Sequence, residues 1–326
     1  MKPLRLGVLL PTRGILLRGE GPIDPSPVLR MAEQAEAAGL DSVWVGDSLT
    51  AKPRLEPLAT LAAVAMRTSR VTLGTAVLLA PLRNPVQLCQ MAATVDILSG
   101  GRLVLGMGVG GAFDEAQRAE WQMVGVDPHV RGARMTELVE VCRRLWAEDE
   151  VTFHGRHFTL EAARSEPKPL QPGGVPMLLA THFGTGSEAQ YRRTGRHADG
   201  AMGNSDGPEA FASMLDRVRF HAGEAGRDAE ALRTAFYMTV NIGHDVERAG
   251  READRFIRAY YGVNVWADKW GPFGTPETVA ERMVEYVRAG AQEIIVRFAA
   301  QDPASQLDAF VKDVMPAVRG ALADDG

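Results

Sequence analysis

Cysteine is scarce in this chain, and its scarcity argues against a disulfide framework and a zinc centre. The 326 residues hold two cysteines, Cys89 and Cys142, with no Cys-x-x-Cys pair, and the seven histidines are scattered along the sequence. A fold stabilised by disulfide bonds needs several cysteine pairs, and a structural zinc site needs closely spaced thiolate or imidazole ligands. We therefore predict no metal site and expect both cysteines to be buried free thiols on helices.

A strong charge excess and long apolar runs are absent as well. The net charge is −5 with 24% charged residues, which gives no reason to expect nucleic acid or an anionic membrane as a partner. No apolar run approaches the length of about 20 residues that crosses a bilayer. The N-terminal residues MKPLRLGVLL lead directly into a strand pattern without a small-residue cleavage site. We expect a cytoplasmic protein without a membrane or nucleic-acid partner.

Residues 70–111 are the most informative segment that is present. Val71–Leu79 is an apolar and β-branched run of the kind found in buried parallel strands. A helical pattern begins at Pro85 and ends at a glycine pair, and Leu103–Leu105 is the returning strand. A right-handed parallel crossover brings both strand ends to one face, so the first strand's end should lie near Gly106–Gly111. We expect the functional site at that face.

Strands and helices alternate along the whole chain, which predicts an α/β protein. Eight alternating units favour a (β/α)8 TIM barrel with loop insertions over an open sheet. No linker divides the sequence, so we expect a single domain over residues 1–326. The insertions are predicted at 110–130, 152–175 and 261–275, with a hairpin over 151–160. The predicted strands are Leu4–Leu10, Ser42–Val45, Val71–Leu79, Leu103–Leu105, Pro176–Ala180, Ala198–Met202, Thr234–Val240 and Glu293–Phe298. The predicted helices are Ser26–Ala38, Pro57–Thr68, Asn84–Ser99, Arg131–Glu148, Ser187–Thr194, Pro208–Glu224, Asp245–Tyr260 and Pro276–Ala289.

Five stretches of the sequence resemble the bacterial luciferase-like monooxygenase superfamily. They are AEAAGLDSVWVGDSL (35–49), residues 70–111, LVEVCRRLWAEDEVTFHGRHFTL (138–160), GRHADG (195–200) and FGTPETVAERMVEYVRAGAQEIIV (273–296). The resemblance covers nearly the whole chain in the right order. It implies a (β/α)8 barrel that binds FMN or the deazaflavin coenzyme F-420 at the carboxyl ends of the strands. It leaves the substrate open, because one barrel supports many reactions through its loops.

The resemblance also implies a bulge in the third strand, packed against the cofactor ring. The matching residues are Gly74, Thr75, Ala76 and Val77, and a non-proline cis peptide bond is expected between Ala76 and Val77. An ordinary buried strand without contact to a cofactor is the alternative interpretation.

The second strand ends in three residues that the resemblance brings to the site. Asp47 matches a position that sets the polar edge of the ring, and Trp44 lies just before it. The next position is often an acid/base histidine in the family, whereas this chain has Ser48. A serine hydroxyl can donate or accept a hydrogen bond but does not titrate near neutral pH. A role of Ser48 in the site and a role as a turn or N-cap serine both remain open.

The glycines that follow the fourth strand let the backbone approach the cofactor in this family, and the relevant positions are Gly108 and Gly110. A Rossmann dinucleotide fingerprint is the competing interpretation of this run. It would need a ribose-binding acid, for which Asp127 has the right distance, but residues 121–128 read as a loop. Some deazaflavin sugar dehydrogenases carry a glutamate where this chain has Gly111, so we do not expect a close copy of that activity.

The cofactor phosphate is expected at Gly184, Thr185, Gly186 and Ser187. This run follows the fifth strand and precedes a helix, so amide groups and two hydroxyls would face an anion at the positive end of the helix dipole. A plain glycine turn with Ser187 as N-cap is the alternative. His182, beyond the same strand, is the most attractive titratable side chain for acid/base work, although the sequence favours the alternative of a histidine satisfied at the surface or behind the site.

Two reactions are consistent with the resemblance. Reduced FMN would react with oxygen, whereas coenzyme F-420 would support hydride transfer to or from a small organic substrate. A flavin reductase or an F-420-reducing enzyme would then be a partner, and a homodimer is expected through the helix Asn84–Ser99. Two alternatives stay open: a flavin-binding barrel without catalysis, and another phosphate-binding barrel enzyme. The latter would want a reactive lysine at a strand end, but Lys52, Lys168 and Lys269 fall in loops.

Overall fold

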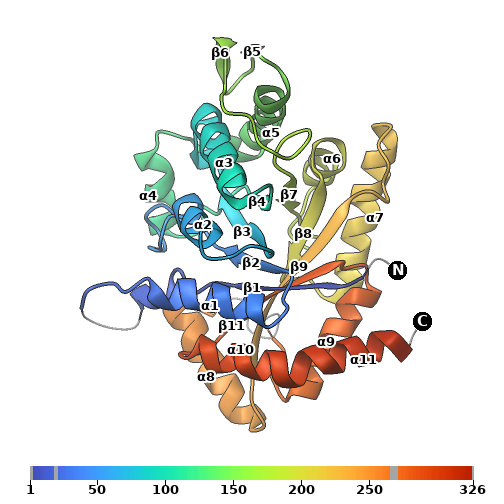
Figure 1. The fold of residues 1–326 in the computed structure, drawn as a ribbon. Helices are drawn as coiled ribbons and strands as arrows, with labels where there is room; N and C mark the ends of the chain where they lie inside the picture. The colour runs from blue at the N-terminus through green and yellow to red at the C-terminus, as the bar shows by residue number, and fades with distance from the viewer. Residues whose placement is uncertain (1–2, 18–20, 265–270, 325–326) are drawn as a thin grey trace.

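Eight parallel strands form a closed barrel in the computed structural model, which describes residues 3–17, 21–264 and 271–324 (Figure 1). The strands pair in the order β9-β11-β1-β2-β3-β4-β7-β8, and β8 pairs with β9 to complete the circle. Their bounds are β1 Arg5–Leu9, β2 Ser42–Val45, β3 Thr72–Leu79, β4 Leu103–Gly108, β7 Met177–Ala180, β8 Gly200–Asn204, β9 Arg233–Ile242 and β11 Glu293–Phe298. The predicted (β/α)8 fold is confirmed.

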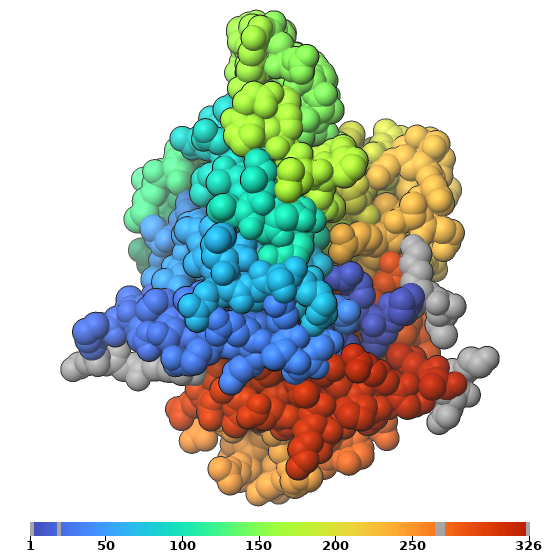
Figure 2. Space-filling view, in the orientation of Figure 1, coloured from blue at the N-terminus to red at the C-terminus, as the bar shows by residue number. Residues whose placement is uncertain are grey.

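Helices surround the barrel and follow the strands in turn. They are α1 Ser26–Ala37, α2 Pro57–Ala65, α3 Pro85–Ser99, α5 Arg131–Ala147, α6 Glu188–His197, α7 Pro208–Glu224, α8 Val246–Tyr261 and α9 Pro276–Arg288, followed by α10 Pro303–Ala309 and α11 Met315–Asp324. A two-residue strand, β10 Phe273–Gly274, pairs with the end of β9. The antiparallel hairpin of β5 Val151–His154 and β6 Thr159–Ala163 projects as a knob from the surface in Figure 2.

Two apolar cores result from the alternation of side chains along each strand. The larger core lies between the barrel and the helices, and the smaller one fills the barrel interior. The interior core consists of Leu9, Trp44, Ala76, Val104, Leu178, Met202, Ala235, Tyr237 and Ile295. Burial on both faces explains why the strands read as apolar runs rather than as alternating ones. The carboxyl ends of all eight strands meet at one face of the barrel, as parallel pairing requires.

Most predicted elements are confirmed, and the largest differences lie outside the repeating units. The predicted loop over 121–128 is partly wrong, because α4 (Glu115–Met123) includes its first three residues. Asp114 and Gln117 form a capping box at the start of α4, a spacing that the sequence displayed. The helices α10 and α11 were not predicted, and β8 begins at Gly200 rather than Ala198. Cys89 and Cys142 are buried free thiols, as expected.

The described ranges contain no helix that is both long enough and apolar enough to cross a bilayer.

Candidate active site

The bulge in β3 is present at the predicted residues. The register of β3 against β4 shifts between Thr75 and Leu78, and the peptide bond between Ala76 and Val77 is cis, which confirms that prediction. Gly108 at the end of β4 faces the bulge, because a Cβ atom added there would stand 2.6 Å from Val77 Cγ2. Ala76 is 7% exposed and Val77 is half-buried. These three residues form a small apolar surface at the mouth of the barrel.

Trp44 and Gly74 lie beneath that surface, toward the barrel interior, and Thr75 follows Gly74 in β3. The Trp44 side chain is fully buried, and its Nε1 donates a hydrogen bond of 2.7 Å to Ser42 Oγ. A side chain at Gly74 would overlap the Trp44 ring, and Thr75 Oγ1 donates to Gly106 O at 2.8 Å. The three residues therefore support the bulge from below and present no surface to a ligand in this structure.

Asp47 joins the ends of β2 and β3. Its carboxylate accepts a hydrogen bond of 2.8 Å from Leu79 N and pairs with both terminal nitrogens of Arg83, at 2.5 and 3.0 Å. The Asp47 side chain is 1% exposed. A bidentate guanidinium pair fixes a carboxylate in orientation and charge. Asp47 thus orders the strand ends around the mouth.

Ser48 holds a turn together in this structure. Its hydroxyl donates to Glu120 Oε1 at 2.8 Å and accepts from Lys52 N at 2.9 Å. Glu120 is 2% exposed and also accepts from the amides of Thr50 and Ala51. The turn interpretation of Ser48 matches this geometry. Glu120 was not foreseen, because it lies on α4, where the sequence suggested a loop.

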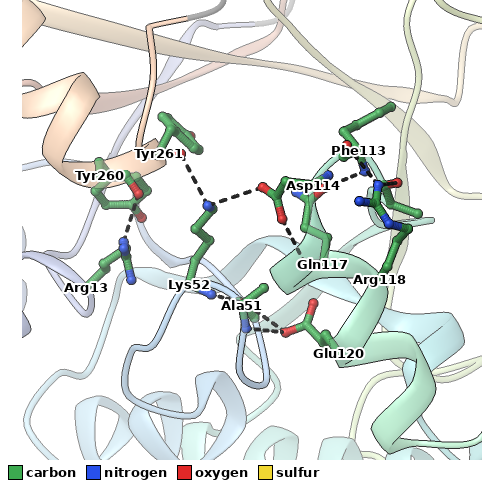
Figure 3. A network of polar contacts seen from close by, with 12 residues as sticks. Arg13, Ala51, Lys52, Phe113, Asp114, Gln117, Arg118, Glu120, Tyr260 and Tyr261 are labelled. Carbon is green, nitrogen blue, oxygen red and sulfur yellow. Dashed lines mark hydrogen bonds and ion pairs between the residues drawn. The ribbon is translucent and has the colours of Figure 1, made fainter.

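Lys52 connects this loop to two other segments of the mouth, as Figure 3 shows. Its Nζ lies 3.4 Å from Asp114 Oδ2 at the start of α4 and donates to Tyr261 O at the end of α8. The loop after β2 is therefore held between α4 and α8. The lysine is engaged in these contacts and lies in a loop, as the sequence indicated.

Gly110 and Gly111 form a turn that packs against α4. Gly110 has a φ of +77°, which favours glycine, and a Cβ there would be 2.9 Å from the Trp121 ring. Trp121 is 1% exposed, and its Nε1 donates to Gly111 O at 2.7 Å. This geometry assigns Gly110 to the turn and to the packing of Trp121. At Gly111, a Cβ would stand 2.9 Å from the Phe113 ring.

His182 lies beyond β7 beside an acidic partner. Its Nδ1 is 3.3 Å from Asn204 O and 3.7 Å from Asp206 Oδ2, and its side chain is 27% exposed. Burial by itself raises the pKa of Asp206, but hydrogen bonds from His182 and from the Phe183 amide outweigh it and hold the pKa below its ordinary value. A carboxylate beside one ring nitrogen orients the imidazole.

The loop Gly184–Ser187 begins α6 in the predicted manner. Only glycine fits at Gly186, since a side chain would overlap the carbonyl oxygen of His182. Ser187 occupies the N-cap position of α6, as the alternative interpretation had it, but its side chain makes no capping hydrogen bond. The Gly184 amide is directed in part to the Asp206 carboxylate. Thr185, Ser187 and the first amides of α6 remain as candidate anion ligands.

A buried arginine at the end of β11 was missed in the sequence. Arg297 is 2% exposed, and it donates to Tyr261 Oη at 2.5 Å and to Thr239 Oγ1 at 2.8 Å. Burial lowers the pKa of Arg297, yet the surrounding tyrosines, Tyr237 first, hold it above the ordinary value. An arginine inside the apolar run EIIVRF was the available signal. A cavity of about 450 Å³ adjoins it, with Leu9, Phe256, Tyr260 and Phe298 among its lining residues.

A closed parallel barrel with its polar and glycine-rich segments at the carboxyl ends of the strands has the architecture of a barrel enzyme, with the active site at that face. Comparison with known proteins agrees. The family model for luciferase-like monooxygenase matches residues 4–293. An F420-dependent glucose-6-phosphate dehydrogenase of Kineococcus radiotolerans is 31% identical, over 90% of this chain and 94% of the relative. The corresponding protein of Mycolicibacterium fortuitum is 30% identical over the same shares.

Solved structures show the same fold at lower identity. An F420-dependent secondary alcohol dehydrogenase has a TM-score of 0.80 at 22% identity, covering 97% of this chain and 99% of that one. Monooxygenase RslO1 from Streptomyces bottropensis has a TM-score of 0.81 at 24% identity, covering 96% and 99%. The chain therefore belongs to the luciferase-like monooxygenase family. As a member of that family it is an oxidoreductase that uses a flavin or deazaflavin, as the resemblance predicted.

Proposed function

We propose that this protein is an F-420-dependent oxidoreductase that transfers a hydride between the deazaflavin and a small organic substrate. The observation that carries the proposal is the small apolar surface of Ala76, Val77 and Gly108 at the barrel mouth. It occurs in a chain 31% identical to an F420-dependent dehydrogenase over 90% of its length. FMN, with oxygen as the reactant, is the competing cofactor and is distinguished by the experiment below.

The residues at the mouth fit a planar ring with an anionic tail. A flat ring can pack only against a surface without bulky side chains. At Gly108 even a Cβ atom would crowd Val77. The indole ring of Trp44 lies below the apolar surface of Ala76, Val77 and Gly108 and supports it. Strand β7 pairs with β4, and in the loop that follows it Thr185, Ser187 and the amide groups of α6 would hold the phosphate, because a helix N-terminus favours an anion.

The deazaflavin, when bound, supplies a two-electron hydride acceptor or donor. Oxidation of an alcohol also releases a proton, which a side chain at the mouth has to accept. His182 is the proposed acceptor, since it is partly exposed and is oriented by Asp206. Asp47 and Ser48 are proposed to act by positioning other groups. Asp47 fixes the ends of β2 and β3, and Ser48 fixes the loop that follows β2.

The proposed partners follow from the cofactor and the fold. A second, F-420-using enzyme would regenerate the cofactor, and a flavin reductase would take that place if FMN were used. We further propose that residues 1–326 act as one domain and that the protein is a homodimer through α3. Met91 is 41% exposed and Leu98 is 44% exposed on that helix. The cytoplasmic location remains a prediction from the sequence.

An anaerobic turnover assay tests the proposal. The protein is incubated with F-420 and a series of alcohols, including 2-propanol and glucose 6-phosphate, and the cofactor absorbance is followed with and without oxygen. We expect reduction of F-420 at equal rates in both atmospheres. We expect no turnover of glucose 6-phosphate, because position 111 lacks the glutamate of the sugar dehydrogenases. Activity that requires FMN and oxygen would contradict the proposal.

A further inference from the structure

Arg54 lies beside the bulge of β3, although no sequence motif marks it. A Cβ added at Gly46, just after β2, would stand 2.5 Å from Arg54 Nη1 and 3.8 Å from Ala76 O. The guanidinium therefore lies above the end of β2, next to the bulge of β3. Arg54 Nη1 also donates a hydrogen bond of 3.1 Å to Tyr260 Oη, at the end of α8. A half-buried cation is thus placed between the proposed ring site and α8.

A second arginine lies against the same tyrosine. Arg13, in the segment after β1, is 9% exposed and donates to Tyr260 O at 3.0 Å and to Pro53 O at 2.9 Å. Figure 3 shows Arg13 and Tyr260 together beside the loop that carries Lys52. The guanidinium carbons of Arg13 and Arg54 lie 5.3 and 5.4 Å from the centre of the Tyr260 ring. The guanidinium carbon of Arg297 lies 4.9 Å from the same centre, so three like charges surround one phenol.

Every acceptor that the structure gives to these two arginines is neutral. Arg54 Nε donates to Lys52 O, and the other acceptors are the carbonyl oxygens of Pro53 and Tyr260 and the Tyr260 hydroxyl. Within residues 3–17, 21–264 and 271–324, no carboxylate pairs with either guanidinium. Burial, and after it the charge of Arg54, lowers the pKa of Arg13. Like charges held this closely without a counter-charge are stabilised by a bound anion.

We infer that Arg54 and Arg13 bind an oxyanion group, a carboxylate or a phosphate, of the substrate beside the Tyr260 ring. Guanidinium groups bind both oxyanions through paired N–H donors. The tail of the cofactor is assigned elsewhere, because Gly184–Ser187 follows β7, which β3 and β4 separate from β2 in the barrel. The cavity of about 450 Å³ to which Tyr260 contributes has a mixed apolar and polar lining and would take the body of the substrate. This inference rests on the proposed function, which makes the face a substrate site.

Calorimetric titration of the full chain with simple probes tests the inference. The probes are benzoate, inorganic phosphate and the neutral isostere benzamide, each added with and without F-420. We expect benzoate or phosphate to bind and benzamide not to bind, and the tighter of the two anions identifies the oxyanion. We expect Arg54→Gln to weaken anion binding about ten-fold or more, as the loss of a charged hydrogen-bonding partner does. Arg54→Lys keeps the positive charge but loses the paired N–H donors of the guanidinium. Its anion affinity should therefore lie between those of the wild type and Arg54→Gln.

Arg255→Gln is the matched control. Arg255 is an exposed arginine on the rim of the same cavity, and the structure gives it no ion pair within the described ranges, so its loss should leave anion binding unchanged. Circular dichroism confirms that each variant is folded. Equal binding of benzoate and benzamide, or unchanged anion binding in folded Arg54→Gln, would overturn the inference. Anion binding through Arg54 by a protein that binds neither F-420 nor FMN would instead refute the proposed function and leave the oxyanion site standing.

Discussion

At the scale of single residues, buried carboxylates organise the mouth of the barrel. Asp47 anchors Arg83 and the Leu79 amide, and Glu120 anchors Ser48 together with two loop amides. Each acid lies on one element and holds another that is distant in sequence. A sequence displays such an acid as an ordinary charged residue, because its partners become visible only after folding.

Replacing Glu120 tests this anchoring role. Glu120→Ala leaves the Ser48 hydroxyl and the amides of Thr50 and Ala51 without their acceptor, so we expect a loss of about 1–3 kcal/mol in the free energy of unfolding. Glu120→Gln keeps an acceptor oxygen and should lose less. Urea denaturation measures both, with Glu115→Gln at the exposed start of α4 as the control. Equal stabilities of Glu120→Ala and the wild type would contradict the anchoring role.

Ser48 is expected to act through its position rather than by proton transfer. Ser48→Ala should shift kcat/KM through the loop geometry and leave the shape of the pH profile unchanged, since a hydroxyl does not titrate in the working range. His182→Gln should remove a titration step from the same profile. A profile that changes shape in Ser48→Ala and keeps its shape in His182→Gln would reverse the two assignments.

At the scale of elements, the repeating βα units and the hairpin after α5 were predictable, whereas the helix in the segment after β4 was not. The bounds of β2, β11 and α7 coincide with the predicted ones, because the strands are buried on both faces and the helix starts at a proline. The segment after β4 was read partly as a loop, since its turn residues outweighed the capping box at Asp114. The start of the helix in this insertion is determined by local capping residues and does not follow the alternation of strands and helices in the barrel.

Hydrogen bonds between α1 and the segment before β3 make the free energy of unfolding depend on pH. Glu36, near the end of α1, accepts hydrogen bonds from the amides of Ser69, Arg70 and Val71 ahead of β3. Burial alone would raise the pKa of Glu36, but these amides lower it to about 2. The carboxylate therefore stabilises the fold fully above the unfolded pKa of about 4.5 and loses that contribution as the pH falls toward 2.

The measurement is urea unfolding of wild type and Glu36→Gln at pH 7, 4 and 3. We expect the difference in free energy of unfolding to be largest at pH 7 and to shrink at each lower pH. Glu281→Gln, at an exposed position of α9, is the control and should differ little from wild type at any pH. A difference that stays constant or grows as the pH falls would show that the Glu36 carboxylate is not stabilised by the amides.

The approach of β4 to the bulge of β3 gives a second prediction at this scale. Gly108→Ala places a methyl group 2.6 Å from Val77 Cγ2, so Val77 has to move. We expect a loss of about 1–3 kcal/mol in the free energy of unfolding, as overpacking produces, and weaker cofactor binding. Gly250→Ala on α8, where a Cβ meets nothing within 4 Å, is the matched control and should be neutral or stabilising. Unchanged cofactor affinity in Gly108→Ala would separate this surface from the ring site.

At the scale of the whole molecule, the fold could be predicted from the sequence, whereas the residues proposed to bind the substrate could not. The alternation of strands and helices indicates a barrel, and a barrel places its site at the carboxyl ends of the strands. The bulge at Ala76–Val77 followed from a resemblance between sequences. Arg13, Arg54 and Tyr260 come from three separate segments of the chain. No local sequence pattern therefore predicts that they lie together.

Assembly is also tested at this scale. The double variant Met91→Glu/Leu98→Glu places charges on the exposed face of α3, and it should convert the proposed dimer into a monomer. Size-exclusion chromatography with light scattering reports the mass. Phe220→Glu changes an equally conspicuous apolar side chain, 60% exposed on α7, and should leave the mass unchanged. A wild-type monomer, or a dimer that survives the double variant, would contradict the assignment of the interface to α3.

The most direct test of the central claim is a side-by-side titration of the purified protein with F-420 and with FMN, followed by cofactor fluorescence. The account predicts saturable binding of F-420 that Gly108→Ala weakens and Gly250→Ala leaves unchanged. Tight binding of FMN alone would contradict the deazaflavin assignment and point to oxygen chemistry, and binding of neither cofactor would contradict the assignment of the barrel mouth as a cofactor site.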